Sequence, residues 1–520
     1  MQPTSHLFGF VVAVLVGYII GRDPIGLSGV SSLLSRGPSA TDGVDNVEAS
    51  QAKILVKRAF LHAWNGYRRY AWGHDGLKPL SQNHSNTFGG LGLTIVDALD
   101  TALIMGLSEE YQQGRAWIQT SLDFDRAGAE VSFFETTIRF LGGLLSTYYL
   151  TGDSLFLQKS IDLGDRLIGS FDSALGFPYP SLNLTTGTPN RTHTVTSFAD
   201  VGSCQLEFGA LSRLTGNSMY RNFSERAAQV ARNQFDTFDG LRPNRIRMDQ
   251  ADQDGRYTLS DGIDSFYEYL LKRYIQLGAW GEDLPLQQMY GEDYSAMVAG
   301  MERHLIVHGR NLVHLSDWNH LKTKVSHYMH HLSCCTPGML ALGSLHIGNR
   351  NRRRKSLQLA EHLCETCYRM YSTVNETGLA AELVAFPLDG RSDLELAFDN
   401  QHKLRPETIE SIYTLFKVTG KEKYRRWGWN IFQAWEQHAK IPEGGYSGLE
   451  DVTIPKSYND VQESFFLSES LKYLYLLFDD DNKVDLENWV FNTEAHPLSL
   501  DPQWTPERAQ SQLENLLGLG

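Results

Sequence analysis

Carboxylates at the start of helical patterns are the side chains in this chain best placed to do chemistry. The clearest case is the stretch 404–411, Leu-Arg-Pro-Glu-Thr-Ile-Glu-Ser, which opens an apolar helical run that stops at Gly420. Proline suits the first helical position, because its missing N–H would be unpaired there anyway. Glu407 and Glu410 then fall in the first turn, on one side of the helix. Helix capping alone would explain one such pair, since a helix N-terminus favours negative charge.

The same layout recurs along the chain, and this recurrence favours a functional interpretation. Acids stand at or near the front of other apolar helical patterns: Asp97 and Asp100, Glu135 with Arg139, Glu207, Asp264 and Glu268, and Glu463 and Glu469. Carboxylates gathered with aromatic side chains in a concave site suit carbohydrate binding and cleavage of glycosidic bonds. We therefore expect a carbohydrate-active site wherever the fold brings these acids together.

The helices that must position these acids are of two alternating kinds. Apolar helical runs end at Thr151-Gly152, Thr215-Gly216 and Thr419-Gly420, and each leads into a second helix that is richer in charge. Glycine is a natural stop at a helix C-terminus. An apolar inner helix followed by an amphipathic outer helix, repeated about six or seven times, predicts a closed α/α toroid. If every inner helix runs the same way, the acids form a ring at one mouth of the barrel.

Length and composition indicate one large globular domain. The chain has 520 residues, of which 42% are hydrophobic, and the repeat favours a single domain over residues 51–500 rather than several. A net charge of −14 argues against a nucleic-acid partner. The one basic run, at 350–355, lies between two helical patterns and is predicted to be a solvated loop.

The ends of the chain carry a leader and a tail. An apolar run spans Leu7–Ile20, which is short for a membrane span and typical of a signal sequence. No small-residue cleavage pattern follows it, which favours a signal anchor over residues 1–21, but a cleaved signal peptide stays open. Either one puts the protein body in the secretory lumen. Residues 22–50 are predicted to be a flexible stem, and 501–520 a tail with a weak helix after Pro506. Glycosylation sequons, which support the lumenal location modestly, occur at Asn83, Asn183, Asn190, Asn222 and Asn375.

Five cysteines leave two interpretations open: Cys204, Cys334, Cys335, Cys364 and Cys367. In an oxidising lumen one pair is expected to form a disulfide, which leaves at least one cysteine over. The rival is a zinc site that would add His327, His330 or His331 to these thiols. Adjacent cysteines are an awkward start for a structural zinc site, so the disulfide is favoured.

Several dispersed motifs, in a fixed order, make the chain resemble the α-1,2-mannosidases of glycoside hydrolase family 47 from about Ala52 to Leu498. They are Trp72-Gly73-His74-Asp75, Asp97-Ala98-Leu99-Asp100-Thr101, Phe134-Glu135-Thr136-Thr137-Ile138-Arg139, Asp264-Ser265-Phe266-Tyr267-Glu268-Tyr269-Leu270-Leu271-Lys272, Leu404-Arg405-Pro406-Glu407 and Phe491-Asn492-Thr493-Glu494-Ala495-His496-Pro497. Each motif is weak alone, and together they are specific. The resemblance implies an (α/α)7 barrel, calcium dependence, inversion at the anomeric carbon, and trimming of terminal α-1,2-mannose from high-mannose N-glycans.

The resemblance also implies roles for individual residues. The principal catalytic acids would be Glu135, Asp264 and Glu407, with Glu382 as a further catalytic carboxylate. Thr493 matches the calcium ligand, which uses its hydroxyl and its carbonyl. Cys334 and Cys367 match the family's disulfide pair. The residues expected to line the sugar site are Arg139, Arg405, Glu410, Phe465, Glu469 and Glu494.

Three positions depart from the family pattern. Gly76 stands where a glutamate is usual, and Ala381 replaces the proline before Glu382. Gly262-Ile263 precedes Asp264 where some endoplasmic reticulum members carry arginine. The last change removes an expected oligosaccharide contact and resembles the broader-trimming Golgi members.

The expected protein is thus a calcium-dependent, inverting exo-α-1,2-mannosidase of the endoplasmic reticulum or Golgi lumen. We expect a monomer, anchored in the membrane as a type II protein, or secreted if the signal is cleaved. The alternative is a glycan-binding factor like the degradation-enhancing relatives of the family. The intact Trp72–Asp75 loop and the retained acids speak against that alternative.

Overall fold

The computed structural model describes residues 48–128, 130–249, 252–319, 324–325, 327–387 and 392–517. The predicted signal segment Leu7–Ile20 and most of the predicted stem lie outside these residues, and both stay predictions. Ala49 and Ser50, placed in the stem by the sequence, already belong to the first described helix. Among the described helices, none combines the length and the hydropathy that a membrane crossing requires.

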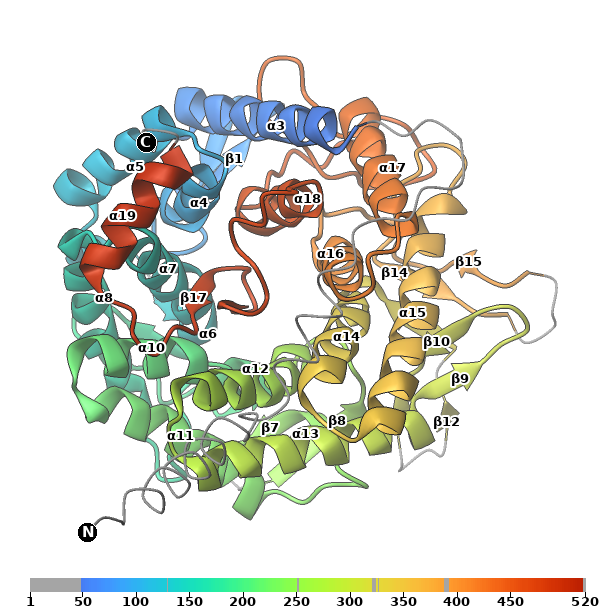
Figure 1. The fold of residues 1–520 in the computed structure, drawn as a ribbon, viewed down its shortest axis with the longest axis horizontal. Coiled ribbons are helices and arrows are strands. Elements are labelled where there is room, and N and C mark those ends of the chain that lie inside the picture. Colours follow the sequence, from blue (N-terminus) through green and yellow to red (C-terminus); the bar gives the residue numbers. More distant parts are fainter. Residues whose placement is uncertain are drawn as a thin grey trace, which may run out of the picture.

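Two concentric rings of helices form the body of the protein (Figure 1). The inner ring consists of α4 (Leu93–Ile104), α7 (Gly142–Thr151), α10 (Gln205–Thr215), α12 (Asp264–Trp280), α14 (Thr336–His346), α16 (Glu407–Thr419) and α18 (Leu471–Leu477). The outer ring consists of α3 (Ala49–Tyr70), α5 (Ser108–Ser121), α8 (Ser154–Leu167), α11 (Ser218–Gln234), α13 (Leu284–His304), α15 (Arg350–Ser372) and α17 (Lys423–His438). Six inner helices pack on the outer helix that follows them, and α18 packs on α3, so the last and first helices close the ring. This is the predicted (α/α)7 barrel.

The two rings differ in composition because they differ in surroundings. Every residue of α4 and α7 is buried, as expected for helices with neighbours on all sides. The outer helix α17 buries one stripe, which includes Ile431, Phe432 and Trp435, and carries its polar residues on the remaining, partly exposed faces.

The glycines after the inner helices end them as predicted. Gly152, Gly216 and Gly420 have φ values of 67°, 69° and 64°, the left-handed conformation that glycine adopts without a steric penalty. At Gly152 a side chain would also collide with the chain after Trp504, because a Cβ would lie 2.4 Å from the carbonyl oxygen of Pro506.

Two inner helices are preceded by π-helical turns, which are often found at functional sites. The short helix α6 (Phe133–Glu135) and the π-helical turn η2 (Thr136–Leu141) lead into α7, and the π-helical turn η5 (Phe466–Ser470) leads into α18. The short helix α6 carries Glu135, and the two π-helical turns carry Arg139 and Glu469, three of the predicted site residues.

Short antiparallel sheets and turns connect the helices. A five-stranded sheet has the order β12-β11-β8-β7-β6, and two three-stranded sheets have the orders β13-β14-β15 and β3-β4-β5. The strands are β1 (Gly76–Lys78), β2 (Asn83–Ser85), β3 (Val131–Ser132), β4 (Ser181–Asn183), β5 (Thr188–Pro189), β6 (Val195–Ser197), β7 (Pro243–Arg247), β8 (Asp252–Tyr257), β9 (Ile306–His308), β10 (Val313–Leu315), β11 (Trp318–Asn319), β12 (Lys324–Val325), β13 (Tyr328–His330), β14 (Leu383–Ala385) and β15 (Glu395–Leu396). The short helical segments are η1 (Phe124–Arg126), η3 (Ile168–Phe171), α9 (Phe198–Gly202) and η4 (His331–Cys335).

A C-terminal hairpin occupies the inside of the ring (Figure 1). Its strands β16 (Trp489–Phe491) and β17 (Pro497–Ser499) pair antiparallel, with Trp489 opposite Ser499 and Phe491 opposite Pro497. The final helix α19 (Pro506–Leu517) packs on α7 and α4. The helix that the sequence predicts after Pro506 is present.

Two local expectations were wrong. The basic run 350–355 is not a loop, because it forms the first turns of α15, where the side chain of Asn349 caps the helix by accepting from the backbone N–H of Arg352. Pro406 precedes α16 as its N-cap and is not its first helical residue.

Candidate active site

A cavity of about 300 Å³ opens at the mouth of the ring where the inner helices begin. It brings together side chains from seven separate parts of the sequence, which are the α6–η2 segment, α9, α12, η4, α16, η5 and the turn of the C-terminal hairpin. Every predicted catalytic, sugar-binding or metal residue lines it except Glu382. The residues it brings together are Glu135, Arg139, Asp264, Arg405, Glu407, Glu410, Phe465, Glu469, Thr493 and Glu494.

Glu407 is a carboxylate that its neighbours keep ionised. Its Oε2 lies 3.0 Å from Nδ1 of His331, and its Oε1 lies 3.9 Å from Nη1 of Arg405. Burial by itself would raise the pKa of Glu407, but the hydrogen bond from His331 and the charge of Arg405 lower it below its ordinary value. His331 is held in turn by the hydroxyl groups of Tyr371 and Thr408, at 2.9 and 3.1 Å from its Nε2.

Asp264 has the opposite electrostatic environment. Asp264 is the first residue of α12. Among the described residues, its carboxyl group accepts one hydrogen bond, from the backbone N–H of Ser265 at 2.9 Å. Burial, against the opposing hydrogen bond from Ser265 and with the nearby charges of Asp261, Glu268 and Glu407 adding to the rise, brings the pKa of Asp264 to about 8. At neutral pH this group therefore carries a proton, while Glu407 does not.

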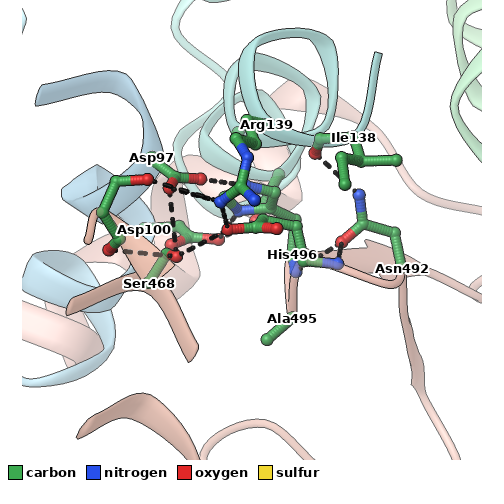
Figure 2. A network of polar contacts seen from close by, with 12 residues as sticks. Asp97, Asp100, Ile138, Arg139, Ser468, Asn492, Ala495 and His496 are labelled. Carbon is green, nitrogen blue, oxygen red and sulfur yellow. Dashed lines mark hydrogen bonds and ion pairs between the residues drawn. The ribbon is translucent and has the colours of Figure 1, made fainter. Parts of the chain in front are cut away.

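Arg139 gathers carboxylates from distant parts of the chain (Figure 2). Its Nε donates to Oε2 of Glu135 at 2.6 Å, and its Nη1 binds Glu494 and lies 3.8 Å from Oδ2 of Asp97. The guanidinium also lies over the ring of Phe465, 5.8 Å from its centroid. The guanidinium of Arg139 thereby holds two carboxylates in place: Glu135, at the end of α6, and Glu494, in the turn of the hairpin.

Behind Arg139 lies a fully buried network that holds the hairpin (Figure 2). The ring of His496 bridges two carboxylates, with Nε2 3.1 Å from Asp97 and Nδ1 2.8 Å from Asp100. Lys472 pairs with Asp100 at 2.9 Å and donates to the carbonyl of Ala495 at 2.6 Å. Although burial alone would raise it, the charge of Lys472 and the His496 contact hold the pKa of Asp100 near 2.

The turn that carries Thr493 has a fixed shape. The amide oxygen of Asn492 accepts from the N–H groups of Glu494 and His496, at 2.9 and 2.8 Å, and Ala495 adopts a left-handed φ of 58°. The hydroxyl of Thr493 donates to Oε2 of Glu268 at 2.8 Å. The threonine is thereby presented to the cavity on a preorganised loop.

The cavity is lined by many more carboxyl groups than guanidinium groups, and this is the test of whether a cation fits. Against the guanidinium groups of Arg139 and Arg405 stand nine carboxyl groups: Glu135, Asp200, Asp261, Asp264, Glu268, Glu407, Glu410, Glu469 and Glu494. Burial raises the pKa of Glu410 to about 7, even against the opposing charge of Lys272, with Glu268 and Glu407 adding to the rise. Burial and mutual repulsion raise the pKa of Glu469 and Glu494 as well.

Carboxylate oxygens suit a hard divalent cation such as Ca²⁺, and the positive charge of such an ion would also reduce the repulsion between neighbouring carboxylates. Within the described ranges, no three acidic, histidine or cysteine side chains converge closely enough to chelate a metal by themselves. A calcium ion would therefore depend on the oxygens of Thr493, with water or sugar hydroxyls completing its shell.

Glu382 lies behind the cavity wall and not on it. Both of its oxygens accept from Nε of Arg405, at 2.8 and 2.7 Å, and the Arg405 guanidinium lines the cavity. The structure therefore places this carboxylate, expected from the resemblance to be catalytic, where it can orient Arg405.

The structure contains the disulfide that the resemblance implies, between Cys334 and Cys367. It ties η4, which carries His331, to the outer helix α15. The disulfide uses two of the candidate zinc ligands, and His331 contacts Glu407 and Tyr371. Among the described residues no three histidine, cysteine or acidic side chains are grouped to hold a metal, so the structure does not support the zinc interpretation. Cys204, Cys335 and Cys364 are free, and Cys335 lines the cavity.

Several side chains of the site were not assigned a role from the sequence. Glu268 follows Asp264 by one helical turn, so the spacing on α12 could have revealed it. His331 and Asp261 lie in loops or short turns, where no periodicity signals their direction. Gly262, at the cavity wall, has a φ of 83°, so a side chain there would be strained as well as close to Ser197 and Asn244.

A ring of paired helices with carboxylates crowded at one mouth defines the class: a helical-barrel, carbohydrate-active protein. The chain belongs to glycosyl hydrolase family 47, whose sequence profile matches residues 59–500.

Individual relatives agree with this assignment. The endoplasmic reticulum mannosyl-oligosaccharide 1,2-alpha-mannosidase of Homo sapiens is 44% identical over 482 residues, which are 90% of this chain and 66% of the human protein. The chain thus spans about two thirds of that relative. Mannosyl-oligosaccharide 1,2-alpha-mannosidase MNS1 of Arabidopsis thaliana is 40% identical over 472 residues, covering 90% of this chain and 82% of the plant protein. Among solved structures, an alpha-1,2-mannosidase from Trichoderma reesei superposes with a TM-score of 0.79 at 27% identity, over 88% of this chain and 100% of that one.

Proposed function

We propose that this protein is a calcium-dependent, inverting exo-α-1,2-mannosidase that trims terminal mannose from high-mannose N-glycans in the secretory pathway. The observation that carries the proposal is the pairing, in one cavity, of an ionised carboxylate at Glu407 with a protonated one at Asp264. Inverting glycosidases need one carboxyl group in each state, on opposite sides of the bond they cleave. The names of the relatives favour mannose as the sugar.

Glu407 is the proposed general base. In a single displacement, the oxygen of a water molecule attacks the anomeric carbon of the terminal mannose while Glu407 accepts a proton from that water. His331 holds the carboxylate in position through its 3.0 Å contact. The hydroxyl partners Tyr371 and Thr408 fix the imidazole ring in turn.

Asp264 is the proposed source of the proton that the leaving oxygen takes. Its pKa of about 8 keeps it protonated at neutral pH, and the bond between the anomeric carbon and the glycosidic oxygen breaks as that oxygen receives the proton. The resemblance makes Glu135 the other candidate, either directly or with water relaying a proton from Asp264. Glu135 is held in an ion pair with Arg139, and Asp264 has no such partner among the described residues.

Phe465 and Arg405 are the proposed contacts that hold the sugar. Phe465 offers a ring at the cavity wall, and Arg405, oriented by Glu382, offers guanidinium donors to hydroxyl groups. The hydroxyl and carbonyl of Thr493 would hold Ca²⁺, which when bound would orient sugar hydroxyls and offset the surrounding carboxylates.

We also propose which glycan the protein accepts and in which compartment it acts. Gly262 leaves the cavity wall without a side chain, which favours acceptance of several branches of an oligomannose glycan. The endoplasmic reticulum named for the human relative and the exposed sequons at Asn83, Asn183 and Asn222 favour the secretory lumen, with endoplasmic reticulum and Golgi both open. Attachment to a membrane would depend on Leu7–Ile20, outside the described residues.

Incubating the chain with an oligomannose glycan, with and without a calcium chelator, tests the proposal. We expect mannose to be released in calcium and not in chelator, with stepwise loss of hexose units by mass spectrometry. Asp200→Asn, which alters a carboxyl group of the wall without a proposed chemical role, serves as the control. Binding of the glycan without release of mannose under any condition would favour the glycan-binding factor instead.

A further inference from the structure

A second cavity, of about 370 Å³, lies at the opposite mouth of the ring. We call it the distal pocket; its lining residues are Leu150, Lys483, Asp485, Asn488, Trp489, Ser499, Asp501, Trp504, Arg508 and Leu516. The hairpin spans the distance between the two cavities, because its turn residues Thr493 and Glu494 line the catalytic cavity while its outer ends, Trp489 and Ser499, line the distal pocket. Figure 1 shows α19 over the wall of the ring, near α4, α7 and α8, where it packs on α7 and α4.

Two tryptophans give the distal pocket an aromatic wall. Trp504 is held edge-on by Tyr148 and Tyr149, at ring distances of 5.1 and 5.0 Å, and its indole N–H donates to the carbonyl of Tyr149 at 3.0 Å. Trp489 is only 8% exposed, and its indole N–H has no acceptor among the described residues. The indole nitrogen of Trp489 is not among the buried polar atoms that lack a partner, so it stays accessible to water, and a ligand that accepts from it can take the place of that water.

The polar groups of the distal pocket are fixed and balanced in charge. The amide nitrogen of Asn488 donates to both oxygens of Asp485, at 3.1 and 2.9 Å, which leaves its amide oxygen as an acceptor. Asp501 pairs with Arg508 at 3.3 Å. With Lys483 the pocket therefore holds two positive and two negative side chains, and this balance favours a neutral ligand over an ion.

We propose that the distal pocket binds a neutral saccharide of one or two pyranose rings. Rigid aromatic faces, one free indole donor and a few oriented amide, carboxylate and guanidinium groups match a ring whose faces are apolar and whose edge is hydroxylated. The volume is within the range of small-molecule sites. Both carboxylates already have partners, so the pocket is equipped to bind a sugar and not to cleave it. This role is independent of the proposed hydrolysis.

The probe is methyl α-D-mannopyranoside, titrated onto the full chain and followed by saturation-transfer NMR. The background chain carries Arg405→Ala and Phe465→Ala, which remove two of the groups proposed to hold sugar in the catalytic cavity. We expect saturable binding to persist in that background. Adding Arg508→Ala should weaken it at least fivefold, and so should Trp489→Phe, which removes the indole donor and keeps an aromatic ring. Thermal unfolding of each variant checks that it folds.

Arg303→Ala is the matched control. Arg303 is 56% exposed and pairs with Asp239, which closely parallels the 55% exposed Arg508 in its pair with Asp501, but it lies on another helix away from the pocket. The proposal is overturned if the background chain does not bind the probe, or if Arg508→Ala binds it as Arg303→Ala does. Displacement of the probe by inorganic phosphate would also overturn it, because the pocket would then be an anion site. None of these outcomes bears on whether the unmodified chain hydrolyses the glycan, so the two proposals can fail separately.

Discussion

Glu407 and Asp264 show how neighbours set the chemistry of two similar side chains. Both are buried in the same cavity, and burial acts on both in the same direction. The difference is that Glu407 has His331 and Arg405 beside it, whereas Asp264 faces further carboxylates. A base and an acid therefore arise from the same functional group.

Asp264 should set the alkaline limb of the pH profile. Its pKa of about 8 means that kcat/KM falls as pH rises through that range and the proton is lost. A bound divalent cation would move the limb toward lower pH, since positive charge favours the ionised form. Initial rates across pH should show that Asp264→Asn is slow, by about 10²–10⁴-fold, and lacks this limb. Loss of the limb in Glu135→Gln instead would assign the proton to Glu135.

The same pKa makes a prediction about folding. Because the pKa of Asp264 is raised in the folded state, the folded chain loses stability as pH rises from the unfolded value of 3.8 toward about 8. Thermal unfolding at pH 8 should therefore show Asp264→Asn to be more stable than the unmodified chain. Equal melting temperatures at pH 8 would contradict the raised pKa.

His331 should determine, through the pKa of Glu407, where the acidic limb of the kcat/KM profile lies. Removing its hydrogen bond takes away the main contact that lowers the pKa of Glu407, so His331→Ala should move the acidic limb of kcat/KM to higher pH. Tyr371→Phe, which removes only a hydroxyl partner of the imidazole, should move it less. An acidic limb that does not move in His331→Ala would remove Glu407 from the role of base.

At the residue scale, the sequence could predict the carboxylates but not their partners. Helical spacing places Glu407 and Glu410 on one face, and the dispersed motifs identify Asp264 and Thr493. The pairing of His331 with Glu407 joins residues 76 positions apart, and no local pattern encodes such a contact. The position of Glu382 behind Arg405 likewise depends on the path of a loop.

Among the elements, the C-terminal hairpin is the one whose placement depends on buried charge. His496 and Lys472 neutralise Asp97 and Asp100 where no water reaches them, and this fixes the turn that presents Thr493 and Glu494. The charges are therefore part of the architecture of the site.

Removing His496 should destabilise the protein strongly. A buried charge left without its partner costs about 3–5 kcal/mol, so His496→Ala should lower the free energy of unfolding by about that amount. The control is His304→Ala, which breaks a more exposed pair with Asp239 and should cost no more than about 1 kcal/mol. Denaturant unfolding measures both, and equal effects would contradict the role given to the buried network.

Helix α15 shows where sequence patterns compete. The basic run 350–355 is predicted as a loop because runs of like charge are usually solvated, and a helix N-terminus also disfavours positive charge. The Asn349 cap and the buried stripe of Ala360, Leu363 and Met370 outweigh that penalty. The glycine stops after α7, α10 and α16 were predictable because their cause is local.

At the scale of the whole molecule, the ring has two mouths joined by one hairpin. The repeat of inner and outer helices could be predicted from alternating composition, because a helix buried on all sides is apolar throughout and a helix at the surface is apolar on one side. The sequence also predicts that the ring is closed, but not that α18 and α3 close it, nor the distal pocket beneath α19, since both depend on contacts between the two ends of the domain.

Calcium should stabilise the whole fold by mass action. At about 100 times its dissociation constant, an ion that binds only the folded state adds about 2.7 kcal/mol to the free energy of unfolding. Thermal unfolding with and without calcium should show this gain in the unmodified chain and not in Thr493→Val. Thr188→Val, at an exposed threonine in β5, is the control and should keep the gain. A gain retained in Thr493→Val would place any calcium site elsewhere.

The central claim is that carboxylates from distant helices converge at one mouth, where water attacks the anomeric carbon of the terminal mannose and displaces the rest of the glycan in a single step. The anomeric configuration of the first mannose released, followed by proton NMR before mutarotation, tests it most directly. We predict β-mannose from an α-linked substrate, with release abolished in Glu407→Gln while glycan binding is kept. Initial release of α-mannose, or a near-normal rate in Glu407→Gln, would contradict the account.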